Sequence, residues 1–185
     1  MDQDTCLKHH FLVAMPHMSD PWFAHSVCYI CDHDEHGAMG LVINKPINMS
    51  LTDIFAELNM SFAEQADIQL RQGGPVSQEQ GFILYQGDFD EAQNIPIAPN
   101  VKLSTSKEFL QCLADNKGPE NFIPCLGYAG WEAGQLEAEL ANNGWLTVPA
   151  DETLLFHTPV MDIAQAAARK LGIDINLLSQ DAGHA

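Results

Sequence analysis

Apolar residues recur along this chain with two periods, one typical of strands and one typical of helices. Short apolar runs that are rich in β-branched or aromatic side chains and bounded by Gly, Pro, Asn or Asp predict buried strands. These runs lie at 11–14, 26–31, 38–43, 68–70, 81–85, 101–103, 122–126 and 145–148. The polar residues between the second and third runs predict a β-hairpin.

The helical period brings apolar residues three or four positions apart onto one face. Ser50 is placed to cap a helix over 51–58, and Ser104 or Ser106 is placed to cap a second helix that ends near 116–118. Thr158 as cap, with Pro at the next position, predicts a last helix that runs to about Leu171.

The most informative pattern begins with the strand at 122–126. Gly127 and Gly130 predict a sharp Gly-rich turn after this strand, because glycine accepts backbone angles that other residues avoid. An amphipathic helix over 132–140 follows, and the Asn-Asn-Gly at 142–144 predicts its end. The pattern is therefore strand, glycine turn, helix, strand.

Strands and helices are interspersed irregularly, and the hairpin breaks the βαβ order. This pattern predicts the α+β class rather than a doubly wound sheet. The 185 residues suffice for one domain with a sizeable core, and the chain has neither a linker nor a fixed-period repeat. We expect a single domain over 1–185, with 179–185 as a frayed tail.

The charge is strongly acidic, with 8 Lys and Arg against 25 Asp and Glu, a net −17. A polyanion is repelled by nucleic acid and anionic lipid unless a local basic patch outweighs the average. No Lys or Arg occurs between Lys117 and Arg169. Direct nucleic-acid binding is therefore disfavoured.

The lengths of the apolar runs and the number of cysteines indicate a cytoplasmic location. No apolar run approaches the roughly 20 residues that span a bilayer, and the run at 11–14 is too short for a secretory signal. Five cysteines, an odd number, indicate reduced thiols rather than a disulfide framework. We expect a cytoplasmic protein with no membrane partner.

The Cys28-x-x-Cys31-x-His33-x-x-His36 spacing offers ligands that zinc accepts. However, side chains alternate across a strand, so Cys28 and Cys31 are expected on opposite faces, where they cannot share one ion. We therefore predict no metal site, and we interpret this motif as a strand followed by a polar hairpin turn.

Motifs for nucleotides and for catalysis are equally weak. The Gly127, Gly130 and Gly134 spacing is neither a dinucleotide fingerprint nor a Walker A loop, and Glu132, expected in the first helical turn, would face a phosphate. No nucleophile elbow occurs. Cys112 and Cys125 fit a helix face and a core strand, and His157 fits a structural role. We predict no cofactor, and no catalytic residue is identified.

Eight motifs make the chain resemble the YqgE/AlgH family of bacterial proteins. They are Phe11–Pro16, Asp20-Pro21-x-Phe23, Gly37–Pro46, Gly73–Val76, Gly127–Trp131, Gln135-Leu136-Glu137-x-Glu139-Leu140, Asn143-x-Trp145-Leu146 and Leu171–Asp174. They span nearly the whole chain in the expected order. Two positions depart from the family pattern: Tyr85 stands where many members carry His, and Ile163-Ala164 stands where a basic residue and Trp are common.

The resemblance implies a fold but no activity. It implies an α+β arrangement with a bent mixed sheet and a small barrel-like portion, flanked by about four helices. The family's molecular activity is not established, and the label "transcriptional regulator" on some members rests on genetic effects.

Three Gly/Pro-rich loops carry more polar groups and glycines than plain connections need, and we take them as a candidate binding surface. Its residues are Asn44, Lys45, Pro46, Gly73, Gly74, Pro75, Tyr128, Gly130, Trp131, Gln135 and Glu139. The alternative is that these glycines only allow close packing.

The hypothesis we favour is a non-enzymatic binding or regulatory protein that contacts a protein or a small ligand. A small-molecule enzyme is a second hypothesis, and it requires Lys45, Tyr128 and Glu139 to share one cleft. Direct DNA regulation is a third, which the net charge disfavours.

Overall fold

The structure is a computed structural model that describes residues 6–63, 67–89 and 94–178. The strands are β1 His10–Ala14, β2 Val27–Asp34, β3 Gly37–Val42, β4 Pro46–Ser50, β5 Gln69–Gln72, β6 Val76–Gln86, β7 Ile95–Ala98, β8 Val101–Ser104, β9 Phe122–Glu132 and β10 Trp145–Pro149. The helices are α1 Leu51–Glu57, α2 Lys107–Ala114, α3 Gln135–Ala141, α4 Glu152–His157 and α5 Ile163–Arg169, with 3-10 turns η2 Val160–Asp162 and η3 Ile175–Leu177. The predicted tail at 179–185 lies outside the described residues.

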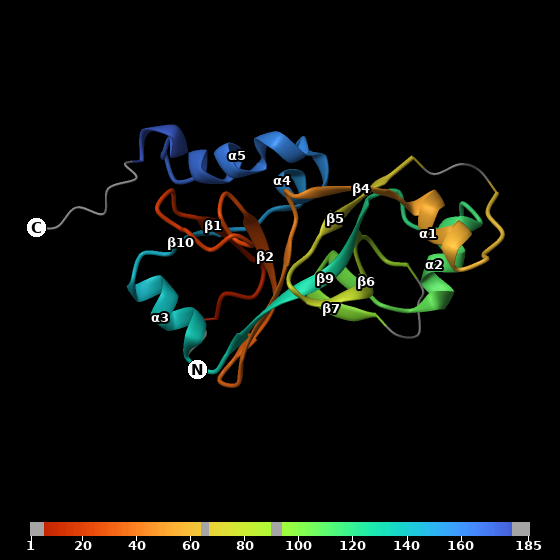
Figure 1. Ribbon diagram of the computed structural model, residues 1–185, viewed down its shortest axis with the longest axis horizontal. Coiled ribbons are helices and arrows are strands. Elements are labelled where there is room, and N and C mark those ends of the chain that lie inside the picture. Colours follow the sequence, from red (N-terminus) through yellow and green to blue (C-terminus); the bar gives the residue numbers. More distant parts are fainter. Residues whose placement is uncertain (1–5, 64–66, 90–93, 179–185) are drawn as a thin grey trace, which may run out of the picture.

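Strand β9 is the centre of the sheet (Figure 1). One of its edges pairs antiparallel with β3 and, nearer its start, parallel with β5, while its other edge pairs antiparallel with β6. The order β10-β1-β2-β3-β9-β6-β8-β7 forms one curled sheet, to which β4 attaches through β5. The predicted α+β fold with a bent, mixed, partly barrel-like sheet is confirmed.

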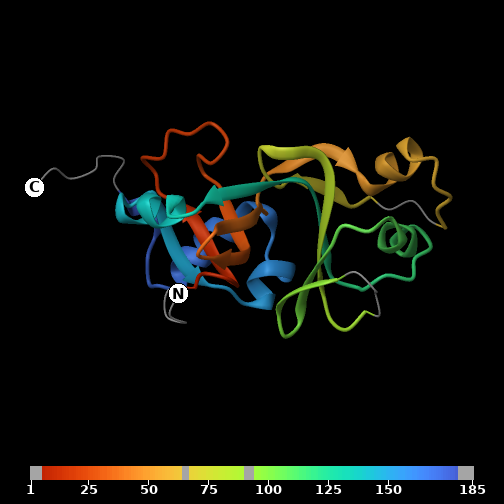
Figure 2. The same cartoon turned by 90° about the horizontal axis from the view of Figure 1, so that it is seen from below.

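The helices cover the sheet in three places (Figures 1 and 2). Helices α4 and α5 pack on one face of β1, β2 and β10, where Leu155 and Ile163 join the main core. Helix α3 packs on the opposite face through Leu136. Helices α1 and α2 lie at the far end of the molecule and bury Phe55 and Phe109.

The strands between α3 and α5 are buried on both faces, so their side chains alternate between two cores. Tyr29 and Cys31 point into the main core, while Cys28 and Ile30 point into the core under α3. The predicted placement of Cys28 and Cys31 on opposite faces is therefore confirmed.

The predicted hairpin and two predicted helix caps are also confirmed. The β2–β3 hairpin forms, and Ser50 caps α1 in a capping box with Asp53. Ser106 caps α2, where its side chain accepts a hydrogen bond from the backbone N–H of Phe109. Each of these features depends on residues that are close in sequence, which is why the pattern could show them.

The predicted glycine turn after residue 126 is wrong. Strand β9 continues through Gly127 and Gly130 to Glu132, and the turn lies at 133–134. Pairing with β3 over 129–132 and with β6 at Tyr128 keeps this segment in the sheet, although Gly127 itself adopts a left-handed φ of 72°. Glu132 consequently ends a strand and does not lie in the first turn of a helix.

Other boundaries were also wrong. Strand β7 lies between the predicted strands at 81–85 and 101–103, where no strand was predicted, and β6 begins at Val76, five positions before the predicted 81. Thr158 ends α4, and the last helical region starts with a 3-10 turn before α5. The described residues hold five α-helices where about four were predicted, because the short apolar segment 152–157 folds as α4. None of the helices in the described residues is long and apolar enough to cross a membrane.

Candidate functional site

The predicted loops at 44–46 and 73–75 and the predicted glycine turn at 127–131 do meet, but as a crossing of backbone segments. Strands β5 and β6 flank opposite edges of β9, so the residues between them must pass across β9. A Cβ atom at Gly73 would lie 2.2 Å from the Gly127 carbonyl oxygen, and one at Gly74 would lie 2.1 Å from the Tyr128 carbonyl carbon. These contacts leave no room for a side chain. Gly73, Gly74 and Gly127 are therefore explained by close packing.

Asn44 and Lys45 hold the loop that precedes β2. The Asn44 side chain accepts a hydrogen bond from the Val27 N–H at 2.7 Å and donates one to the His25 carbonyl at 2.9 Å. The Lys45 ammonium donates to the Trp22 carbonyl at 2.6 Å. Partial burial lowers the pKa of Lys45, which nearby Asp20 opposes. Both side chains thus position their own chain. Pro46, the third residue of this loop, begins β4 and is exposed.

Gln135 and Glu139 belong to a network under α3. The two carboxylate oxygens of Glu139 accept hydrogen bonds from different partners. Oε2 accepts one from the indole N–H of Trp131 at 2.9 Å and one from that of Trp145 at 2.8 Å, and Oε1 accepts one from the side-chain amide of Gln135 at 2.9 Å. Gln135 in turn accepts the backbone N–H of Glu132 at 3.0 Å. Both indoles are only 5% exposed. The network fastens α3 to the sheet.

The predicted surface therefore separates into parts with different neighbours. Lys45 contacts the Trp22 carbonyl, Glu139 contacts the two indoles, and the Tyr128 ring packs edge-on against the Phe82 ring with centroids 5.5 Å apart. These three residues do not form the shared cleft that the enzyme hypothesis requires. Pro75 lies with the exposed residues 77–80 of β6 in a shallow surface hollow. Tyr128, Gly130 and Trp131 do line an open hollow of about 680 Å³, together with residues that were not predicted.

We name this hollow the acidic face and define it by Asp32, Asp34, His36, Gly37, Ala38, Met39, Gln80, Phe82, Tyr128, Gly130, Trp131 and Glu132. Strand register orders its residues in rows. Asp34, Gly37 and Glu132 are opposite one another on β2, β3 and β9, so two carboxylates flank a glycine on one face of the sheet. Residues two strands apart are separated by about 10 Å.

The floor of the acidic face is apolar. In the next row Asp32 pairs with Met39, which pairs with Gly130, and the Tyr128 and Phe82 rings continue the surface. No Lys or Arg lines the hollow, and one of its carboxylates, that of Asp32, forms an ion pair with Lys8 at 3.5 Å. The alternation of Asp32, His33 and Asp34 was the sequence signal for this face, and its interpretation as a turn concealed it.

His33 supports the acidic face from below. Its Nδ1 accepts the Leu7 N–H at 2.9 Å, so the proton of the neutral ring is on Nε2, which donates to Glu137 at 2.9 Å. Hydrogen bonding to its own backbone N–H, followed by the bond from His33, holds the pKa of Glu137 below its usual value, against the effect of partial burial. One imidazole thus ties the N-terminal segment, the hairpin and α3 together.

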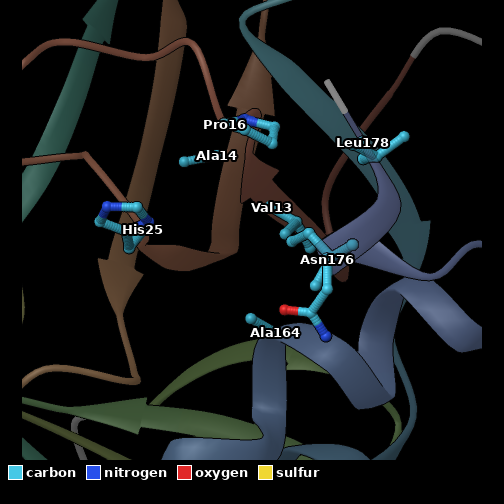
Figure 3. Close-up of a pocket in the computed structure, with 8 residues that line it drawn as sticks. Val13, Ala14, Pro16, His25, Ala164, Asn176 and Leu178 are labelled. Atoms are coloured by element: carbon cyan, nitrogen blue, oxygen red, sulfur yellow. The ribbon is translucent and has the colours of Figure 1, made fainter. Parts of the chain in front are cut away.

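A second hollow, of about 360 Å³, lies between β1, the loop before β2 and the α5–η3 segment (Figure 3). Its polar side chains are His25 and Asn176, which lie on different sides of an apolar surface. It is lined by no carboxylate, cysteine, Lys or Arg. No two of its groups could share a proton or a metal ion, and we assign it no chemistry.

The thiols of the core are unreactive. Burial raises the pKa of Cys28, Cys31 and Cys125, in the last case to about 12 although the Arg71 guanidinium opposes the change. The described residues contain no group of three or more His, Cys, Asp or Glu side chains that could hold a metal ion. The Cys28 and Cys31 thiols cannot share one ion, because they lie in different cores.

Residues 11–176 match the protein-family model described as AlgH-like. The chain belongs to the AlgH-like family. A UPF0301 protein of Saccharophagus degradans is 49% identical over 180 residues, which cover 97% of this chain and 89% of the relative. The UPF0301 protein AlgH of Pseudomonas aeruginosa is 46% identical over 184 residues, 98% of this chain and 97% of the relative.

Solved structures agree with this membership. The solution structure of AlgH from Pseudomonas aeruginosa has a TM-score of 0.81 at 45% identity and covers 100% of this chain and 99% of its own. A crystal structure of a Corynebacterium diphtheriae protein, 22% identical, shares the fold with a TM-score of 0.72, covering 97% of this chain and 94% of its own. The resemblance inferred from the motifs is confirmed. These names state no molecular activity, so the function must be argued from the site.

Proposed function

We propose that this AlgH-like protein is a non-catalytic binding protein that recognises a cationic segment of a partner protein on its acidic face. The observation that carries the proposal is the row formed by Asp34, Gly37 and Glu132. Two carboxylates lie on either side of Gly37, which is itself required by packing, because a Cβ atom there would lie 2.1 Å from the Trp131 carbonyl oxygen. A Lys or Arg side chain of a partner that lies along this row is attracted by both carboxylates.

The apolar floor supports a protein partner over a free cation. Met39 and Tyr128 provide apolar area beside the carboxylates, and protein interfaces combine such a centre with a polar rim. Met39 and Tyr128 are partly exposed at the edge of the main core. Covering them would add hydrophobic stabilisation to the charge attraction.

Chemical catalysis is not part of the proposal. The acidic face holds no cysteine or lysine. Its His36 is exposed at the tip of the hairpin, where the ring lies 3.7 Å from the neighbouring Glu35 carboxylate and the backbone N–H donates to Asp34 Oδ1 at 2.8 Å. Nucleic acid is also a poor partner, because the three carboxylates would repel phosphate. A cytoplasmic location belongs to the proposal and is supported by five cysteines that form no disulfide.

The test is a charge reversal with a matched control. The double variant Asp34→Lys with Glu132→Lys reverses the row, and Glu57→Lys with Glu108→Lys makes the same change in net charge on the exposed surface of α1 and α2. Partners captured from an extract of the source cells by wild-type protein are identified by mass spectrometry. Each is then purified and titrated at two salt concentrations.

The expected result is direct binding that weakens with salt, is lost in the first double variant and persists in the second. A partner that binds both variants equally well contradicts the proposal. A salt-independent affinity contradicts it too, because attraction between exposed charges must be screened.

A further inference from the structure

Gly81 is a glycine that the fold does not require. It lies inside β6, its φ is outside the left-handed region, and a Cβ atom built on it would have no atom within 4 Å. Gly73 and Gly74, in contrast, are required by contacts near 2 Å. A glycine weakens a strand and often marks a bulge or a close approach to the backbone. Gly81 stands where the pairing of β6 with β9 shifts register, and its missing side chain also leaves the backbone there open to a ligand.

The space over Gly81 is an apolar groove between α1 and α2. Alternation along β6 puts Gly81 on the same face as Ile83 and opposite Phe82, so it faces away from the acidic face. The groove has a volume of about 260 Å³, which corresponds to roughly nine water molecules at ~30 Å³ each. Its apolar lining is Leu51, Ile54, Leu58, Leu70, Ile83, Leu110, Pro124 and Leu126.

Apolar side chains remain uncovered along this groove. Leu58, which ends α1, is 46% exposed, and Ile54 and Leu110 are only partly buried. An apolar lining that stays in contact with water gains free energy when an apolar body fills it. The groove is therefore shaped for an apolar chain.

Charged side chains at the rim of the groove indicate the polar group that a ligand with an apolar chain would carry. Lys107 lines the groove at the start of α2, and among the described residues no carboxylate lies within ion-pair distance of its ammonium. The other lysines of the described chain differ: Lys8, Lys102, Lys117 and Lys170 pair with carboxylates, and Lys45 is held by a carbonyl. Glu79 lines the groove from β6, so an anion is accepted beside Lys107 and repelled beside Glu79.

We propose that this groove binds an amphipathic carboxylate of medium chain length. Its aliphatic chain lies over Gly81 against the leucines of α1 and α2, and its carboxylate pairs with Lys107. This site is independent of the acidic face, because it lies on the opposite face of β6 and uses none of its carboxylates. Free carboxylic acids and acyl groups that end in a carboxylate share this chemistry.

The test is a titration of the purified protein with octanoate below its micellar concentration, followed by amide chemical shifts. Octanol is the matched ligand without charge. Gly81→Ile fills the groove with a side chain that strands favour, and Lys107→Gln removes the ammonium without touching the core. Lys117→Gln, at an exposed lysine that follows α2, is the matched control.

The expected result is octanoate binding that shifts the Gly81, Leu110 and Leu126 amides and is lost in Gly81→Ile. Because Lys107 is exposed, its removal should weaken octanoate by only about threefold and leave octanol and the Lys117→Gln control unchanged. Equal affinity of octanoate and octanol for the wild type overturns the assignment of a carboxylate. If octanoate binds Gly81→Ile as tightly as wild type, the proposed groove is not the binding site. If Gly81→Ile fails to fold, the proposal is tested by Lys107→Gln instead, and unchanged octanoate affinity in that variant contradicts it.

Discussion

The two indole N–H groups that share Glu139 allow a quantitative prediction. Glu139→Ala removes the common acceptor and leaves Trp131 and Trp145, each 5% exposed, with N–H groups that lack a partner. A hydrogen bond to a charged acceptor contributes about 1.5–3 kcal/mol. Glu139 is partly exposed, so the lower value applies to each of the two bonds, and the better helix propensity of Ala recovers a few tenths.

The expected loss in the free energy of unfolding is therefore about 2–3 kcal/mol. For a chain of this length 1 kcal/mol corresponds to roughly 2–4 °C in Tm, so Tm should fall by about 5–10 °C. Urea and thermal unfolding followed by far-UV circular dichroism measure the loss, and near-UV circular dichroism reports on the indoles. Glu139→Gln keeps a carbonyl acceptor and should lose about 1 kcal/mol.

Glu57→Ala, which removes an exposed carboxylate from α1, is the control and should stay within about 0.5 kcal/mol of wild type. If Glu139→Ala is as stable as this control, the two indole hydrogen bonds do not stabilise the fold. The assignment of Glu139 to packing rather than to ligand binding would then be refuted.

Three further predictions follow from the same structure. Gly73→Ala places a Cβ atom 2.2 Å from a backbone oxygen and should lower the free energy of unfolding by roughly 3 kcal/mol or more. In Gly81→Ala the new Cβ atom meets no other atom, so this variant should be as stable as wild type or more stable by up to about 1 kcal/mol. Thermal unfolding of the two variants shows whether the backbone crossing at Gly73 is as tight as described. The pKa of Glu137 lies below its usual 4.5 in the folded state, so its contribution to stability is present above pH 4.5 and is lost as the pH falls through the folded pKa; urea unfolding at pH 7 and pH 3.5 should show a smaller difference for Glu137→Gln than for wild type, and equal differences would contradict this. Alkylation of the native protein at pH 8 should modify partly exposed Cys6 well before Cys125, whose pKa is raised to about 12; mass spectrometry that finds both modified at the same rate would show that the core opens readily.

Helix caps and the β2–β3 hairpin were readable from the sequence because the residues that make them are neighbours in the chain. Ser50 with Asp53 and Ser106 with Phe109 are three positions apart. Alternation within β2 likewise showed that Cys28 and Cys31 could not share a metal ion. The family followed from ordered motifs, and these also implied the bent mixed sheet.

The candidate site was only partly readable, for a physical reason. Whether Gly127 makes a turn or continues a strand depends on partners at Val76 and Gly74, about fifty positions away along the chain. Gly73 and Gly81 are both glycines that follow a Gln, so their local sequence does not distinguish them. Tertiary contacts make the first necessary for packing and leave the second facing an open groove.

The sequence alone thus determined the class of the fold, the caps, the family and the strong negative charge, all of which depend on composition or on short spacings. Only the tertiary structure decided which carboxylates stand together. Asp34 and Glu132 are almost one hundred positions apart, and the register of β2, β3 and β9 places them on either side of Gly37. Register is set by long-range pairing and by which face is buried, and a one-residue shift would have turned these side chains to the other face.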